Sequence, residues 1–311
     1  MIGVCIVTYN QEQYIARAIE SVLMQSECWH NVVAYIGNDC STDSTSDICH
    51  QYAKQYPGRI VVVDNEQNLG LVGNTMNLLE IMRKDGCEYI AMLDGDDYWC
   101  DDHKLQKQIA YMDVHPEYGL VHTCVDLLYP HKMVYDVRKV VKEGDVSTII
   151  FDYNIGNCSV VFKTELLNHI NFEEFQSQGF MSCDYIMYII FSCYTQFGFL
   201  SDHTAVWRRG HDSVSNTNNM EKQIRYVQND IAMWRYAAKL FPDRWTAVEN
   251  DLEEYLHYRS FIIAFKYGDR HRAIKEAKLM GENYRTKESL KNIVANSRFL
   301  FALWNLYKRL F

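Results

Sequence analysis

The sequence of 311 residues lacks several features, and each absence excludes a class of protein. No apolar run approaches the roughly 20 residues that span a bilayer. Residues 2–7 form a strand-like run directly after Met1, where a secreted chain would carry a basic and then an apolar segment, so we expect an unsecreted protein. The formal net charge of −9 provides no basic excess for a phosphate backbone, which argues against nucleic acid as the main partner.

Paired cysteines are also absent. The ten cysteines are scattered singly and none forms a C-x-x-C pair, which disfavours a zinc site. Most lie in apolar segments, and this is typical of small buried thiols in a reducing compartment. No internal repeat or low-complexity tract is present, so the composition, 48% hydrophobic, predicts a globular protein with a sizeable core.

Two periodicities alternate along the first hundred residues. Each of four short apolar runs is followed by a polar turn and then by apolar residues at helical spacing. This alternation with short links predicts a parallel sheet with right-handed crossovers, covered by helices on both faces. The four strands are expected at residues 2–7, 32–36, 60–63 and 89–93.

The pattern changes further along the chain. Residues 102–114 and a segment opening at Asp184 have helical spacing, whereas from about residue 218 the pattern is helical throughout. Further strands are expected at residues 119–124, 157–162, 197–200 and 204–207. We predict an α/β fold with a mostly parallel sheet and a C-terminal helical appendage, divided at residues 1–100, 101–217 and 218–311.

Polar residues gather where the predicted strands end. Tyr9, Asp39 and the cluster from Asp94 to Asp97 all follow such strands, and ligands collect at the carboxyl ends of strands in sheets of this kind. Three carboxylates within four residues after a buried run need cations or hydrogen-bond donors around them, so the cluster could hold a hard divalent cation. A solvated acidic turn is the alternative.

Four segments carry a resemblance to a known family. They are residues 4–10 (VCIVTYN), 38–43 (NDCSTD), 68–70 (NLG) with Asn74, and 93–97 (LDGDD). In this order they resemble the successive signatures of family 2 glycosyltransferases, over roughly residues 1–215. The resemblance implies the GT-A fold, in which residues 1–100 bind a nucleotide-sugar and residues 101–217 bind the acceptor.

The resemblance also implies roles for the nucleotide side of the site. Tyr9 would border the base with Thr8 beside it, and Asp39 would accept a hydrogen bond from a ring N–H of the base. The helix-capping alternative fits Asp43 better than Asp39. Asn74 joins the implied nucleotide-binding residues.

The acid cluster corresponds to the D-x-D motif of the family. The resemblance implies that Asp94 contacts the ribose or diphosphate and that Asp96, with Asp97 adjacent, coordinates Mn²⁺ or Mg²⁺. Such a cation would bridge the diphosphate and neutralise charge on the leaving group.

Sugar transfer also needs a base for the acceptor hydroxyl. Residues 178–186 (QGFMSCDYI) match the position of that base, which assigns it to Asp184. The family often has two acidic residues or Gly-Asp here, whereas this chain has Cys183 before Asp184. The alternative is that Asp184 only stabilises the N-terminus of a helix.

Residues 205–215 resemble the segment in which an aromatic–Arg pair precedes His and Ser, although the His lies one residue late. Arg208 or Arg209 would bind the diphosphate and His211 would approach the metal or phosphate. The other histidines, such as His103, His115 and His122, are interpreted as structural.

The resemblance implies an inverting glycosyltransferase that moves a sugar from a nucleotide-sugar, with a UDP-sugar as the leading donor, to a hydroxyl of a glycan or lipid-linked glycan. The resemblance places it in bacterial surface polysaccharide synthesis, in the cytoplasm or at the inner face of its membrane. An inactive nucleotide-sugar-binding or scaffold protein and a metal-dependent nucleotidyltransferase are the alternatives. The latter would be expected to show a Gly-rich basic loop after the first strand, and a dehydrogenase a G-x-G-x-x-G motif; neither is present.

The last fifteen residues combine apolar positions at helical spacing with Arg298, Lys308 and Arg309. This pattern suits a helix that packs on the core of the protein, which is the default, or one that lies in a membrane interface. No residue pattern specifies the donor sugar or the acceptor.

Overall fold

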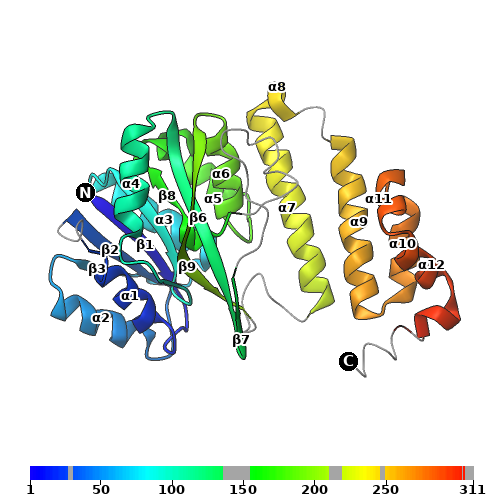
Figure 1. The fold of residues 1–311 in the computed structure, drawn as a ribbon, viewed down its shortest axis with the longest axis horizontal. Coiled ribbons are helices and arrows are strands. Elements are labelled where there is room, and N and C mark those ends of the chain that lie inside the picture. Colours follow the sequence, from blue (N-terminus) through cyan, green and yellow to red (C-terminus); the bar gives the residue numbers. More distant parts are fainter. Residues whose placement is uncertain (27–30, 136–154, 210–218, 246–248, 303, 305–311) are drawn as a thin grey trace. The chain divides into compact units, whose positions relative to one another are not determined.

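The computed structural model describes residues 1–26, 31–135, 155–209, 219–245, 249–302 and 304. His211 and the end of the C-terminal segment, residues 305–311, therefore lie outside the described residues. The chain divides into two compact units, residues 1–211 and residues 212–311 (Figure 1).

In the described residues of the first unit, one sheet of nine strands has the order β3-β2-β1-β4-β8-β6-β9-β5, with β7 paired to β6. The four strands β1 to β4 are mutually parallel, as predicted. Each alternates with a helix along the chain (Figure 1). Their bounds are β1 Ile2–Thr8, β2 Val32–Asn38, β3 Ile60–Asp64 and β4 Tyr89–Asp94.

Helices cover both faces of this sheet, because apolar residues point to each face in turn along every strand. Ile15 and Ile19 of α1 pack in one cluster with Val4 and Ile6 of β1. On the other face α3 approaches so closely that a Cβ on Gly37 would lie 2.3 Å from the Asn74 side chain. The helices are α1 Ile15–Leu23, α2 Thr45–Gln55 and α3 Gly70–Lys84.

The second half of the sheet is mixed. Strand β8 is antiparallel to both β4 and β6, whereas β6 and β9 run parallel through a bulged register near Cys124. The two strands expected at residues 197–200 and 204–207 are one continuous β9. The strand expected from residue 157 begins only at Val161, because residues 157–159 form a 3₁₀ turn, η3. The elements are β5 Tyr98–Trp99, α4 Lys104–Val114, β6 Tyr118–Tyr129, β7 Lys132–Val134, η3 Asn157–Ser159, β8 Val161–Lys163, η4 Thr164–His169, α5 Phe172–Ser177, α6 Asp184–Ser192 and β9 Gln196–Arg208.

The second unit is helical in its described residues. Phe261 and Phe265 of α9 pack with small residues of α10 and α12, and Phe301 adds to this core with its ring centroid 5.5 Å from that of Phe265. Among the described residues no helix is both long and apolar enough to cross a membrane. The helices are α7 Met220–Leu240, α8 Pro242–Trp245, α9 Glu249–Tyr267, α10 Arg270–Leu279, α11 Glu282–Lys287 and α12 Ser289–Asn296.

Candidate active site

The parallel register brings three strand ends together. Thr8 at the end of β1 lies opposite Asn38 at the end of β2, and Val7 lies opposite Asp94 at the end of β4. The backbone N–H of Asp39 donates to the carbonyl of Thr8 at 3.0 Å. The residues predicted to bind the nucleotide are therefore neighbours at one edge of the sheet.

Hydrogen bonds connect the loops that follow β1 and β2. The backbone N–H of Asn10 donates to Ser41 Oγ at 3.0 Å, and Asn10 Oδ1 accepts from the backbone N–H of Thr42 at 2.7 Å. Asn10 adopts a φ of 52°, in the left-handed region that Asn tolerates. Gln11 N–H donates to Thr45 Oγ1 at 2.8 Å at the start of α2. The two loops are thus joined by bonds from backbone N–H groups of each loop to side-chain oxygens of the other.

Asp39 is nearly buried, with 3% of its surface exposed. Its Oδ1 accepts from Asn65 Nδ2 at 2.9 Å and from the backbone N–H of Leu69 at 2.8 Å. Among the described residues no hydrogen bond reaches its Oδ2. One carboxylate oxygen is held by the protein, and the other remains an acceptor for a ligand N–H. Tyr9, 48% exposed, lies at the adjoining end of β1.

Thr8 and Asn74 are buried beneath the strand ends that carry Tyr9 and Asp39. Thr8 is 3% exposed and its hydroxyl donates to Gln11 Oε1 at 2.8 Å. Asn74 is 2% exposed, donates to the Gly37 carbonyl at 2.8 Å and accepts from Asn65 Nδ2 at 3.0 Å. Because Asn65 also bonds Asp39, this placement favours a role for Asn74 in holding Asp39 over direct ligand contact.

The acid cluster forms a tight turn after β4. The Gly95 N–H donates to the Val7 carbonyl at 2.9 Å, and a Cβ on Gly95 would lie 2.4 Å from Gln11 Oε1, so a larger residue would require the Gln11 side chain to move. Burial, followed by the charges of Asp96 and Asp184, raises the pKa of Asp94 to about 7. Carboxylates that raise one another's pKa in this way fit a site that takes a cation.

Asp97 differs from its two neighbours. It is 3% exposed, and Oδ1 accepts the backbone N–H of Arg208 at 2.9 Å. Burial, followed by the charges of Asp96 and Asp94, raises its pKa well above the usual value. Asp97 thus joins the acid turn to the end of β9, which favours a structural role over the predicted metal contact. Asp94 and Asp96 remain as oxygen donors, and one or two carboxylates are the usual protein share of a Mg²⁺ site that also binds phosphates.

Arg208 lies between two tyrosine rings. Its Cζ is 5.2 Å from the ring centroid of Tyr14 and 5.0 Å from that of Tyr98, while Arg17 approaches the same Tyr98 ring at 5.0 Å. Its Nε is buried and has no hydrogen-bond partner in the described part of the chain. A buried, unsatisfied donor is costly, so an anion here would be stabilised. Arg209 instead lies over Trp207 at 4.3 Å.

Asp184 begins α6, and its charge contributes to the raised pKa of Asp94, so α6 brings it within electrostatic range of the acid cluster. The capping position belongs to Cys183, which makes no side-chain capping bond. Asp184 is the acidic residue of the first turn, a position where carboxylates are common because they interact favourably with the helix dipole. The following residues of α6, from Tyr185 to Ser192, are all buried, which holds this N-terminus in place.

Residues 3–151 match the family model described as glycosyl transferase family 2. This segment belongs to that family. The putative teichuronic acid biosynthesis glycosyltransferase TuaG of Bacillus subtilis is 41% identical over 113 residues, which are 36% of this chain and 42% of that protein. The chain spans about a third of the length of the first curated relatives it matches.

Solved structures share the fold beyond the family 2 segment. S. aureus TarS 1-349 in complex with UDP-GlcNAc matches with a TM-score of 0.58 at 15% sequence identity. The match covers 94% of this chain and 90% of the TarS chain. Mannosyltransferase PcManGT from Pyrobaculum calidifontis, in complex with GDP-Man and Mn²⁺, matches with a TM-score of 0.59 at 16% sequence identity. This match covers 99% of this chain and 87% of the PcManGT chain. The GT-A fold predicted from the sequence is confirmed.

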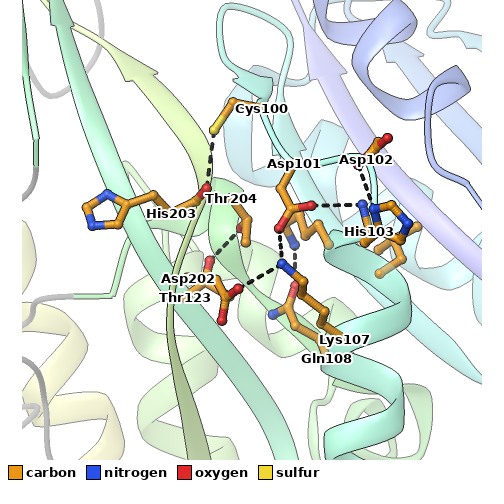
Figure 2. A network of polar contacts seen from close by, with 12 residues as sticks. Cys100, Asp101, Asp102, His103, Lys107, Gln108, Thr123, Asp202, His203 and Thr204 are labelled. Carbon is orange, nitrogen blue, oxygen red and sulfur yellow. Dashed lines mark hydrogen bonds and ion pairs between the residues drawn. The ribbon is translucent and has the colours of Figure 1, made fainter.

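A second acidic group lies beyond the family 2 motif (Figure 2). Among the described residues, the cluster of three or more potential metal ligands is Asp101, Asp102 and His103. Figure 2 shows that its members already have protein partners: Lys107 Nζ forms ion pairs with Asp101 and Asp202, each at 2.7 Å, and His103 Nδ1 lies 2.6 Å from Asp102. These contacts fit the structural interpretation of His103.

The sequence pattern does not predict several residues of the candidate site. Asn157 of η3 donates to both oxygens of Asp94, and Tyr188 of α6 donates to Asn157. The rings of Tyr14 and Tyr98 enclose Arg208. Only Tyr98 had a usable signal, since it directly follows the acid cluster. The others are brought in by tertiary contacts between distant segments.

Proposed function

We propose that this chain transfers a sugar from a nucleotide-sugar to a hydroxyl of a glycan or lipid-linked glycan, in polysaccharide synthesis, with inversion at the anomeric carbon. The observation that carries the proposal is the approach of Asp184 to the acid cluster at the strand ends of a family 2 segment. Binding of the donor and removal of the acceptor proton need separate carboxylates, and the electrostatic influence of Asp184 on Asp94 supports assigning the two roles to these groups.

On the donor side, Asp39 Oδ2 accepts an N–H from the base while Tyr9 borders its ring. The imide N–H of uracil suits this acceptor, and TarS, which shares the fold, is solved with UDP-GlcNAc. Asp94 contacts the ribose or diphosphate, and Arg208 Nε donates to a phosphate oxygen. A divalent cation held through Asp96 would supply positive charge to the diphosphate as it leaves.

On the acceptor side, Asp184 takes the proton of the attacking hydroxyl. The new bond from that oxygen to the anomeric carbon forms as the bond from the anomeric carbon to the phosphate oxygen breaks. The nucleoside diphosphate leaves with the bonding electron pair, and no covalent sugar–enzyme intermediate forms, so the configuration inverts.

The test is a panel of nucleotide-sugars assayed for Mn²⁺-dependent nucleotide release, with and without acceptor glycans. We expect release with at least one donor, above all a UDP-sugar. If UDP–Mn²⁺ binds but no donor on the panel is turned over, the chain is an inactive binder. A nucleotidyltransferase would instead release pyrophosphate from a nucleoside triphosphate and a sugar phosphate.

We further propose that the C-terminal residues 270–311 bring the enzyme to an anionic membrane surface, where a lipid-linked acceptor would lie. Residues 270–311 contain ten Lys and Arg against three Asp and Glu. Phe301 packs inward, whereas Phe299 is 71% exposed and Ile293 58% exposed. Exposed apolar residues beside excess positive charge suit an anionic interface. Sedimentation with phosphatidylglycerol vesicles tests this contact, and equal binding to phosphatidylcholine vesicles would contradict the electrostatic part.

A further inference from the structure

The turn η3, which precedes β8, contacts the acid cluster at the end of β4. Asn157 Nδ2 lies 3.4 Å from Asp94 Oδ1 and 3.3 Å from Oδ2, so one amide group contacts both carboxylate oxygens. The Cys158 thiol hydrogen-bonds Asp97. Two neighbouring residues of one turn thus contact two carboxylates of the cluster.

A second bond sets the direction of the Asn157 amide. The hydroxyl of Tyr188, a fully buried side chain of α6, donates to Asn157 Oδ1 at 2.7 Å. With Oδ1 taken by that hydroxyl, the N–H₂ end of the amide must face Asp94. Tyr188 stands one helical turn after Asp184, so the chain Tyr188–Asn157–Asp94 connects the helix that carries the proposed base to the proposed donor site.

Buried polar groups hold η3 itself in place. The Ser159 carbonyl accepts from Gln108 Nε2 at 2.9 Å and from Lys104 Nζ at 3.2 Å, and the Cys158 carbonyl accepts from Trp99 Nε1 at 2.8 Å. Lys104 is fully buried, with its Nζ 4.6 Å from the centroid of the Trp99 ring. A turn anchored at two successive carbonyls offers Asn157 little freedom to move away from Asp94.

We propose that Asn157, oriented by Tyr188, is a positioning residue that fixes the carboxylate plane of Asp94 for the nucleotide diphosphate and its cation. The proposal rests on the proposed function for the identity of the ligand, and not on any contact of Asn157 with substrate. Contact of one amide nitrogen with both oxygens of the carboxylate restricts its rotation, so less ordering of Asp94 is needed when the donor binds.

The test measures Mn²⁺-dependent binding of UDP by calorimetry, together with donor KM, acceptor KM and kcat. Asn157→Ala should weaken UDP–Mn²⁺ binding about tenfold, the scale of a lost hydrogen bond to a charged group, and raise donor KM while acceptor KM stays unchanged. Tyr188→Phe, which keeps the ring in the core, should weaken binding about threefold. Tyr52→Phe is the control, because its hydroxyl donates to Glu20 at 2.7 Å, away from η3.

A double variant separates positioning from general damage. If Tyr188 acts through Asn157, Tyr188→Phe should have no further effect in the Asn157→Ala background. Full additivity would overturn the orienting role of Tyr188, and Asn157→Ala protein that binds UDP–Mn²⁺ like the parent would overturn the proposal. A mere loss of folded protein would lower kcat and leave both KM values unchanged. Parent protein that binds UDP–Mn²⁺ without turnover would contradict the proposed function and leave the Asn157 test intact.

Discussion

The unit of residues 1–211 contains 28 acidic and 14 basic residues, whereas the unit of residues 212–311 contains 12 and 17. In the first unit, acidic residues cluster at strand ends and several are buried, including Asp39 and Asp97. In the second, the described cations Lys275, Lys278 and Arg298 are exposed on helices. Buried charge needs specific partners, whereas exposed charge acts over a surface. From this difference we expect the first unit to bind a specific ligand through its buried acidic groups. We expect the second unit to be attracted to an anionic surface through its exposed cations.

The largest expected effect comes from removing the proposed metal carboxylate of the first unit. Asp96→Ala should abolish Mn²⁺-dependent UDP binding and turnover, because diphosphate would then meet Asp94 without a bound cation. Calorimetry with and without Mn²⁺ measures this. Asp102→Ala, in the second acidic cluster, is the matched control and should bind UDP–Mn²⁺ normally. Reversed outcomes for the two variants would move the metal site to the Asp101–His103 cluster.

Asp184→Asn should leave UDP–Mn²⁺ binding unchanged and lower transfer about 10²- to 10⁴-fold, the usual contribution of a general base. The amide keeps the shape of the side chain but cannot take a proton. Rates of nucleotide release with acceptor present, compared with those of Asp202→Asn, measure the effect. Undiminished transfer would remove Asp184 as the base and restore the interpretation as a plain helix N-terminal residue.

Arg208→Lys should lower kcat/KM for the donor about tenfold. Lysine keeps the charge but loses both the Nε donor and the planar contact with Tyr14 and Tyr98, worth ~1–2 kcal/mol. Steady-state kinetics with Arg209→Lys as the matched variant measures this, since Arg209 also lies over an aromatic ring. A larger loss in Arg209→Lys would transfer the phosphate role to Arg209.

The smallest effect on chemistry is expected in the second unit. Arg298→Glu should leave donor hydrolysis in solution within about twofold of the parent, because Arg298 belongs to the helical unit and not to the unit that contains the candidate site. Binding to phosphatidylglycerol vesicles should fall at least fivefold, since each basic residue near such a surface contributes ~1 kcal/mol. Val114→Ser, at an exposed apolar residue of the first unit, should bind vesicles like the parent. Unchanged vesicle binding by Arg298→Glu would contradict the charge argument.

The sequence predicted the strand ends well because a parallel β/α repeat forces them to one edge. The alternation of periods placed Tyr9, Asp39 and Asp94 at that edge before any contact was known, and the register confirms that the strands end there. Their chemical roles remain predictions, since position alone does not identify the ligand.

The other contacts of the candidate site could not be predicted from the sequence, because they depend on the orientation of side chains within the fold. Asp96 and Asp97 are adjacent in sequence, yet Asp97 is buried against the backbone of Arg208, 111 residues further along. The bond between Asn157 and Asp94 spans 63 residues and depends on the antiparallel insertion of β8 beside β4. Neither period nor composition encodes such contacts, because they arise from tertiary packing and not from local propensity.

The bonds between the loops after β1 and β2 have a consequence for exchanging parts between relatives. Asn10 pairs with Ser41 and Thr42, and Glu12 Oε2 accepts the backbone N–H of Ser44 at 2.9 Å, so each loop completes the other. A chimaera that imports one loop alone would lose these bonds and distort the site on both strands. Residues 8–45 should therefore be transplanted as a single block when the base preference of the enzyme is redesigned.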